Sequence, residues 1–377
     1  MNNLYLAAIC AVLPGLRRST IPKLIENFGD AKALLEASES DLLATGLVEP
    51  KNVIQFISKR SLNLPERLEK FCKLHSVNLV SIYDDAYPQA LKEIFDPPLV
   101  LYVKGEFPQE AYAIGVVGSR EASYYGLKAA SYFASGLASE GIPIISGGAR
   151  GIDTAAHEAA LKSGGKTVAV LGCGLDIAYP ASNQKLFERI AESGAVISEY
   201  PPGTMPRAIN FPARNRIIVG LSRGIIVAEA ARKSGALITA HIAADEGREV
   251  YCVPGNIFES TSIGCHELIR KGAKLVECVQ DIMEDKFIWH AKMQGKFLQP
   301  ELFAEPKIKK SFLKQEKTPP ATELGQKIWA LLKQGALSLE DITLQINEPI
   351  PIISMELLDL QVAGYVDQDN AQRYFRL

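Results

Sequence analysis

Glycine, serine and arginine gather directly after short apolar segments of this sequence, and these residue types can hold an anion. Small residues let backbone N–H groups approach an anion at the start of a helix. Serine adds a hydroxyl donor, and arginine adds a planar fork that fits phosphate. The segments read GSR at 118–120, SGGARGID at 146–153, GCG at 172–174, SG at 234–235 and PG at 254–255. One such loop would indicate only a tight turn, whereas several of them favour anion binding.

Common cofactor and metal motifs are missing from these loops. GxxxxGK[ST] does not occur, which argues against ATP hydrolysis, and Gly118 and Gly126 are too far apart for GxGxxG, which argues against a dinucleotide. The six cysteines form no CxxC pair, which argues against a zinc ribbon or a redox dithiol. We therefore expect neither a cofactor nor a metal.

Residues 200–228 form a basic window without a single Asp or Glu. Its arginines are Arg207, Arg214, Arg216 and Arg223. Pro212 suits the first position of a helix and holds the preceding Phe211 extended, so that the ring could project from a helix start. A ring flanked by arginines is typical of a stacking platform for single-stranded bases. A core ring lying over a sheet is an equally good interpretation of Phe211.

The two helical arginines of this window are expected to have different roles. Arg214 and Arg216 are two residues apart and therefore point to different sides of a helix. At most one of them should face the same groove as Arg207 and Phe211. We expect the other to form a structural pair with an acid.

Catalytic constellations are few. Asp153 and His157 are four residues apart and share a helix face, so they could form an acid–base pair. We favour a helix-start acid that suits the helix dipole, followed by a hydrogen-bonded core histidine. Glu229 ends an apolar run and could be a base or a hydrogen-bond anchor. We predict no catalytic residue and expect a binding protein rather than an enzyme.

The elements that must position these residues alternate along the chain. Short runs rich in valine and isoleucine lie at 113–117, 142–145, 167–171, 195–198, 224–228 and 249–253. Helical stretches at 127–138, 154–162, 184–191 and 237–244 follow most of them. This alternation predicts an α/β domain over residues 66–286, with a doubly wound, mostly parallel, Rossmann-like sheet that is covered on both faces. Its ligand crevice should lie beyond the carboxyl ends of the strands.

The flanking regions differ from this domain. Residues 1–65 indicate a small helical domain, in which the turn at 13–16 is more consistent with packing than with DNA contact. Residues 287–320 are rich in lysine and predict a flexible basic linker. Residues 321–377 predict three helices and a hairpin around 369–370, as in a winged helix. Their net charge of −4 argues against DNA binding and favours a protein–protein role.

Overall composition sets limits on function. The 377 residues are 47% hydrophobic and 22% charged, which is typical of globular proteins and excludes a wholly disordered, collagenous or coiled-coil chain. Lys and Arg number 41 against 43 Asp and Glu. That balance excludes a globally basic nucleic-acid coat protein but allows a local basic groove. No apolar run is long enough to span a membrane, and we expect a cytoplasmic location.

The order and spacing of the motifs resemble a known family. The matching segments are GSR at 118–120, SGGARGID at 146–153, LGCGLDIAYP at 171–180, SEYPPG at 198–203, FPARNRIIVGLS at 211–222, EAARKSGALITA at 229–240 and VPG at 253–255. They resemble the DNA-processing protein A family, also called DprA or Smf. The resemblance implies an extended Rossmann-like domain that binds single-stranded DNA, a SAM-like (helix-hairpin-helix-like) N-terminal domain and homodimers formed through the Rossmann domain. It also implies a role in competence, natural transformation and DNA recombination, in which the protein shields incoming strands and helps load RecA recombinase.

The resemblance also suggests roles for particular residues. Arg120 looks like a DNA contact, Arg207 sits where the family often has a basic DNA contact, and Phe211 lies close to a base-stacking aromatic. The complete set of residues predicted to bind DNA or phosphate is Gly118, Ser119, Arg120, Ser146, Gly147, Gly148, Arg150, Arg207, Phe211, Arg214, Arg216, Ser234 and Gly235.

Two other functions are considered. Related Rossmann folds include phosphoribohydrolases, whose motif resembles PGGxGTxxE and whose Glu serves the chemistry. The comparable segment here reads SGALITA at 234–240 and lacks that Glu, so Asp153 and Glu229 would have to replace it. A weaker alternative is a chromatin or transcription role for the winged helix.

Overall fold

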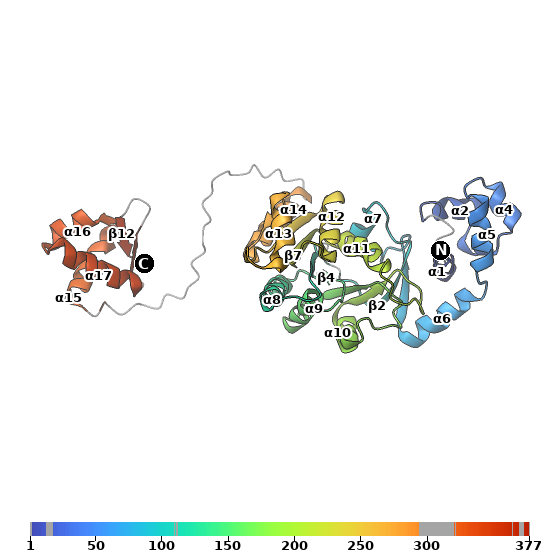
Figure 1. Ribbon diagram of the computed structural model, residues 1–377, viewed down its shortest axis with the longest axis horizontal. Helices are drawn as coiled ribbons and strands as arrows, with labels where there is room; N and C mark the ends of the chain where they lie inside the picture. The colour runs from blue at the N-terminus through green and yellow to red at the C-terminus, as the bar shows by residue number, and fades with distance from the viewer. Residues whose placement is uncertain are drawn as a thin grey trace. The chain divides into compact units, whose positions relative to one another are not determined.

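The computed structural model describes residues 2–12, 18–108, 110, 112–293, 320, 322–363, 365–368 and 373–376. The chain divides into two compact units, residues 1–298 and 299–377, which are described in turn (Figure 1). The expected turn at 13–16, the hairpin at 369–370 and most of the linker at 287–320 lie outside the described residues, and the first linker residues continue a helix. The domain boundaries expected from the sequence stay predictions.

Nine strands form a single sheet in the first unit, in the order β1-β2-β6-β5-β4-β3-β7-β8-β9. They are β1 (Val77–Ser81), β2 (Val100–Gly105), β3 (Ile114–Gly118), β4 (Ile144–Ser146), β5 (Thr167–Leu171), β6 (Ala195–Ser198), β7 (Gly224–Glu229), β8 (Glu249–Cys252) and β9 (Lys274–Leu275). Strands β3 to β9 run parallel, whereas β2 is antiparallel to both β1 and β6. The predicted mostly parallel, Rossmann-like sheet is therefore confirmed, with an antiparallel extension at one edge.

Helices cover both faces of this sheet, which explains why its strands are apolar on both sides. One face carries α8 (Tyr124–Ser139), α9 (Ile152–Lys162), α10 (Gln184–Ser193) and α14 (Gln280–Met293). The other carries α7 (Gln89–Lys92), α11 (Asn210–Leu221), α12 (Gly235–Asp245) and α13 (Ile263–Arg270). Alternate residues of one strand serve the two faces: Val168 and Val170 of β5 belong to one core, and Ala169 and Leu171 to the other.

Short helices before β1 pack on the antiparallel edge of the sheet. They are α1 (Asn3–Cys10), α2 (Ile21–Phe28), α3 (Ala31–Glu36), α4 (Glu39–Ala44), α5 (Pro50–Lys59) and α6 (Leu64–His75). Asn2, Asp30 and Ser38 cap three of them by accepting backbone N–H groups at the first turn. Their core includes Phe56 and extends to Tyr102 of β2.

The second unit contains helices and short strands among its described residues, and the winged-helix assignment stays a prediction. Its helices are α15 (Glu323–Leu331), α16 (Leu339–Ile346) and α17 (Ile350–Val362), and its strands are β10 (Leu337–Ser338), β11 (Val366–Gln368) and β12 (Arg373–Arg376). The strands form an antiparallel sheet in the order β10-β12-β11. Ser338 and Asp341 form the expected capping box of α16. None of the described helices of the protein is long and apolar enough to cross a membrane.

Candidate nucleic-acid interface

The order in which successive strands are added to the sheet reverses between β3 and β7, which are neighbours in space. From β3 the chain proceeds towards β6 on one side, and from β7 towards β9 on the other. The loops after β3 and β7 therefore diverge and leave a crevice at the strand ends, where open α/β sheets bind ligands. A cavity of about 690 Å³ opens there, which we call the strand-end cavity. Its lining includes the predicted site residues Gly118, Ser119, Arg120, Phe211, Arg214, Ser234 and Gly235.

Glu229, at the end of β7, anchors the loop that follows β3. The Ser123 backbone N–H donates to Glu229 Oε1 (3.0 Å), and the Ser123 hydroxyl donates to Glu229 Oε2. Ser123 also caps α8 by accepting the Gly126 N–H. A Cβ at Gly126 would lie 2.6 Å from Glu229 Oε2, so only glycine fits there. Glu229 is thus a hydrogen-bond anchor rather than a free base.

Arg120 is exposed on the same loop. Its guanidinium carbon lies 5.0 Å from the centroid of the Phe211 ring, within the range of a cation–π contact. Among the ion pairs of the described residues, none involves Arg120. Its charge is therefore available to an anionic ligand.

The opposite wall of the strand-end cavity is the start of α12. Ser234 caps this helix through its side chain, which accepts the Ala236 N–H (3.3 Å). Gly235 is exposed, and a Cβ there would meet open space. Lys233, just before the cap, also lines the cavity and is exposed. A cation beside the start of a helix favours an anion.

The loop after β4 contributes less than the sequence predicts. Ser146 is 0% exposed, and its hydroxyl donates to the Val116 carbonyl (2.6 Å), so it is not available to an anion. Gly147 and Gly148 are buried as well, and Arg150 is exposed but lies outside the lining of the cavity. The structure corrects the expectation that Ser146 binds phosphate, because the last residue of β4 points into the sheet.

Arg214 forms part of the cavity wall but is only 4% exposed. Its Nη1 donates to the Gly147 carbonyl (2.7 Å) and to the Val170 carbonyl. A Cβ at Gly147 would lie 2.3 Å from that nitrogen, which explains the glycine. Burial lowers the pKa of Arg214, and the nearby carboxylate of Asp153 opposes this shift. Arg214 therefore fastens the ends of β4 and β5, and its donors are largely used inside the protein.

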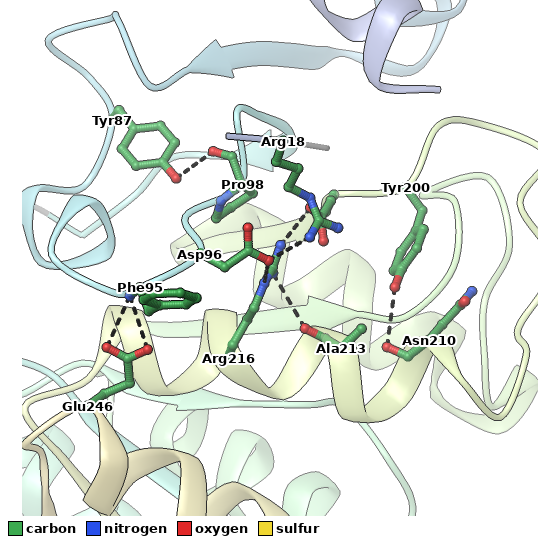
Figure 2. Close-up of polar contacts among 11 residues, drawn as sticks. Arg18, Tyr87, Phe95, Asp96, Pro98, Tyr200, Asn210, Ala213, Arg216 and Glu246 are labelled. Carbon is green, nitrogen blue, oxygen red and sulfur yellow. Dashed lines mark hydrogen bonds and ion pairs between the residues drawn. The ribbon is translucent and has the colours of Figure 1, made fainter. Parts of the chain in front are cut away.

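Arg216 lies in an ion-pair network on another side of α11 (Figure 2). Its Nε lies 3.1 Å from Asp96 Oδ2, and its Nη2 lies 2.7 Å from Glu199 Oε1. Arg18 contacts the same two carboxylates, at 2.6 and 2.9 Å. Two cations and two acids thus balance one another, and the Arg216 side chain is only 11% exposed. The expectation that Arg216 binds DNA is corrected, while the structural pair expected for one of the two helical arginines is present.

Phe211 lies in the first turn of α11, whose start is fixed from both sides. The Asn210 side chain donates to the Gly172 carbonyl (3.0 Å), and the Tyr200 hydroxyl reaches the Asn210 carbonyl at 3.4 Å (Figure 2). The helix begins at Asn210, two residues before Pro212. Phe211 is therefore helical and not extended as predicted. Pro212 still falls where a missing N–H is tolerated.

Arg207 does not join Arg120 and Phe211 in the strand-end cavity. It is exposed and lines a separate cavity of about 670 Å³, together with Arg18, Tyr200 and Asn210. Its neighbours Pro206 and Ala208 line the strand-end cavity. The segment before α11 thus separates the two cavities, and Arg207 faces the one that does not contain Arg120 and Phe211.

Asp153 and His157 are buried parts of α9. Asp153 accepts the Ala149 N–H (3.2 Å), and burial raises the pKa of this carboxyl while Arg214 opposes the shift. His157 is 0% exposed, its Nδ1 lies 2.7 Å from Thr167 Oγ1, and burial lowers its pKa to about 3. This is the helix-start acid and hydrogen-bonded core histidine favoured by the sequence. No cluster that could hold a metal occurs among the described residues.

The fold and the cavity define an open α/β protein that offers cations, backbone donors and an aromatic ring beyond its strand ends. The family model for DNA recombination-mediator protein A matches residues 78–286, and the chain belongs to this family. A relative from Streptococcus pneumoniae, DNA processing protein DprA, is 50% identical over 210 residues, which cover 54% of this chain and 73% of the relative. Protein Smf of Escherichia coli is 36% identical over 319 residues, covering 82% and 81%. The resemblance inferred from the motifs is confirmed.

Two solved structures are also similar. The X-ray structure of DNA processing protein A from Streptococcus pneumoniae has a TM-score of 0.64 and 41% identity, covering 75% of this chain and 97% of the other. A structure of DNA processing protein A from Helicobacter pylori, described for its single-stranded DNA binding mode, has a TM-score of 0.50 and 31% identity. It covers 56% of this chain and 96% of the other. Both support the Rossmann-like fold.

Sequence reasoning missed one residue of the strand-end cavity and two residues of the neighbouring ion-pair network. Tyr179 lines the strand-end cavity, and its ring centroid lies 5.6 Å from that of Phe211. Its position inside the LGCGLDIAYP motif was the available signal. Asp96 and Arg18, which pair within the network around Arg216, lie in unremarkable segments, and nothing in the local sequence indicates their roles.

Proposed function

We propose that this protein binds single-stranded DNA across the strand-end cavity, with little sequence preference and without cleaving it. The observation that carries this proposal is the exposed Arg120 guanidinium over the Phe211 ring, in the lining of the strand-end cavity. Proteins that bind single strands combine cations for the phosphates with rings for the bases. Both parts of a nucleotide would find a partner here.

Unpaired bases are central to this proposal. A base can stack on a ring only where its face is free, and duplex DNA keeps its bases stacked on one another. The Helicobacter pylori relative, described for a single-stranded DNA binding mode, supports the same ligand for this chain. Of the predicted residues, Gly118, Ser119, Arg120, Phe211 and Gly235 fit this role, and Arg207 would contact a strand that continues past α11.

The cellular role and the partners are proposed from family membership. We assign the protein to natural transformation and DNA recombination, where it would shield incoming strands and help load RecA recombinase. We also propose a homodimer formed through the Rossmann-like domain. Because RecA must reach the same strand, the protein should leave part of the bound DNA accessible.

Nucleotide cleavage has less support from the geometry. The two acids that would have to replace the missing Glu are Asp153, which is buried beside Arg214, and Glu229, which Ser123 engages through two hydrogen bonds. A general base needs a free carboxylate within reach of its substrate. We therefore expect that the protein releases no nucleobase when it is incubated with nucleoside monophosphates.

The deciding experiment is a paired titration of the full chain. Fluorescent oligo-dT and a duplex of equal length are titrated under the same salt concentration, and RecA is then added to the single-strand complex. We expect tighter binding to oligo-dT than to the duplex. We also expect faster RecA filament formation on this complex than on the same DNA coated with an unrelated single-strand-binding protein. Equal affinity for the duplex would overturn the single-strand proposal.

A further inference from the structure

Helix α8 presents a row of tyrosine and lysine side chains outside the strand-end cavity. Tyr124, Lys128 and Tyr132 are spaced by four residues and therefore lie on one side of the helix. All three are exposed, and the exposed fractions of the two tyrosines are 82% and 51%. These three residues do not belong to the lining of the strand-end cavity. They place a cation between two rings on the surface of α8, and we call this row the α8 stripe.

The opposite side of α8 holds the stripe in a fixed position. Ala130, Phe133 and Leu137 are buried in the core that α8 forms with α9 and the sheet. The Tyr132 ring meets the Phe133 ring edge to face, with centroids 5.3 Å apart and planes inclined by 75°. Side chains on such a rigid element lose little conformational entropy when a ligand binds to them.

Tyr125 is exposed as well but is already engaged. Its hydroxyl donates to the Pro254 carbonyl (2.6 Å) and ties α8 to the segment that follows β8. Among the ion pairs of the described residues, in contrast, none involves Lys128. The charge of the α8 stripe is therefore available to a ligand.

The charge along α8 favours a polyanion. The helix contains neither Asp nor Glu, and Lys128 is its only charged residue. The nearest acids in the sequence, Glu121 and Glu140, lie before and after the helix. A lysine without an acid on its own helix attracts phosphate, and the two rings beside it offer surfaces on which bases can stack.

The α8 stripe also follows directly on the strand-end cavity. The loop before α8 carries Arg120, which lines the cavity, and Tyr124 follows four residues later. Ser123 ties this loop to Glu229 by a backbone hydrogen bond of 3.0 Å, so the loop and the helix start are held together. Along the helix axis, Tyr124 and Tyr132 are about 12 Å apart, and Lys128 lies midway between them. Cations that alternate with rings are the arrangement that single strands use for phosphates and bases.

We infer that the α8 stripe is a second contact surface for single-stranded DNA. A strand that leaves the cavity beside Arg120 continues along α8, where Tyr124 and Tyr132 stack with bases and Lys128 pairs with a phosphate between them. The inference rests on the proposed binding of single-stranded DNA and specifies where the strand continues. A strand that only fills the strand-end cavity does not reach the stripe, so the stripe contributes to the binding of long strands alone.

The test titrates the full chain with oligo-dT of about 4 to 16 nucleotides, the range over which single-strand binders differ in site size. Tyr124→Ser/Tyr132→Ser should bind the shortest strand of measurable affinity as the wild type does. Its affinity for the longest strand should fall at least about fivefold, the loss expected for one stacked base. Tyr124→Phe/Tyr132→Phe keeps both rings and should bind all lengths as the wild type does.

Lys128→Ala tests the cation of the stripe separately. The slope of log affinity against log salt should become shallower by about 0.7 on the longest strand, because one phosphate contact is lost. On the shortest strand the slope should not change. An unchanged slope on both strands would remove Lys128 from the proposed contact surface.

Lys70 and Tyr83 supply the matched control. Lys70 belongs to α6, Tyr83 follows β1, and both are exposed at the antiparallel edge of the sheet. Lys70→Ala/Tyr83→Ser removes the same kinds of side chain and should leave the affinity for every length unchanged. Tyr124→Trp should show fluorescence quenching that saturates with the longest strand and is absent with the shortest. Thermal unfolding of each variant checks that a loss concerns binding and not folding.

The outcomes separate this inference from the proposed function. If the wild type binds oligo-dT of no length, the proposed function fails. If the wild type binds oligo-dT and the double-serine variant binds every length equally well, the function stands and the α8 stripe is not a DNA contact. If that variant loses equal affinity for the shortest and the longest strand, the substitutions act on the cavity itself, which also overturns the inference.

Discussion

The strand-end cavity and the exposed face of α17 in the second unit differ most clearly in charge and polarity. The cavity presents the exposed cations Arg120 and Lys233. On α17, Met355 is 70% and Leu358 59% exposed, and the exposed Asp359 is the next residue. Phosphate is attracted by the first surface and repelled by the second. A net charge of −2 for the whole chain describes neither of them.

A second difference concerns whether a cation is already engaged. In the second unit, Lys327 forms an ion pair with Glu323. In the first unit, Arg214 donates hydrogen bonds to buried carbonyls and Arg216 forms ion pairs. Arg120, in contrast, is in no ion pair among the described residues, and its guanidinium lies over the Phe211 ring. Counting arginines therefore does not locate a DNA site. What matters is which of them form no ion pair or buried hydrogen bond within the protein.

The largest expected effect is the loss of stability on removing an engaged arginine. Arg214→Leu leaves the Asp153 carboxylate buried without its cation and leaves the Gly147 and Val170 carbonyls without a donor. A buried acceptor left without its donor costs about 1–3 kcal/mol, and two such carbonyls are left here. Urea unfolding should therefore show a much lower midpoint for this variant.

The double variant Arg214→Leu/Asp153→Asn provides the control. Neutralising Asp153 removes the unpaired charge, so part of the lost stability should return, as a double-mutant cycle would report. If Arg214→Leu instead folds normally and loses most of its DNA affinity, Arg214 contacts the ligand directly. The distinction between engaged and available arginines would then be wrong at this position.

The next effect concerns the available cation. Arg120→Ala should weaken oligo-dT binding about 10- to 150-fold, because a hydrogen bond to a charged group contributes about 1.5–3 kcal/mol. The slope of log affinity against log salt should become shallower by about 0.7, the value for one phosphate of a single strand. Binding titrations between about 50 and 200 mM salt measure both the affinity and its slope against salt.

Arg189→Ala is the matched control for that variant. Arg189 is an exposed arginine of α10 that pairs with Glu158 at 3.0 Å, outside the strand-end cavity. Its loss should change neither affinity nor slope. A slope that drops equally in both variants would mean that DNA responds to the general field of the protein and not to Arg120.

These contrasts also show how far the sequence could be interpreted. The parallel sheet was predictable because runs rich in valine and isoleucine, buried on both faces, alternate with helices. The loops at the strand ends followed from that order. The partners of the arginines were not predictable: Asp96 is 120 residues from Arg216, and only the tertiary fold brings the two together. Likewise, Ser146 points inward because it is still part of β4.

The smallest effect is expected at α17. In Met355→Ser/Leu358→Ser, two exposed apolar side chains become polar without disturbing the core residues Ile353 and Leu357. Surface changes of this kind alter stability by no more than about 0.5 kcal/mol. We expect oligo-dT affinity within twofold of the wild type, because the acidic neighbours of this face repel phosphate and the DNA should not bind there. A severalfold loss of affinity in the same titration would place α17 on the DNA, and the separation of a DNA-binding cavity from an apolar, acidic second unit would have to be abandoned.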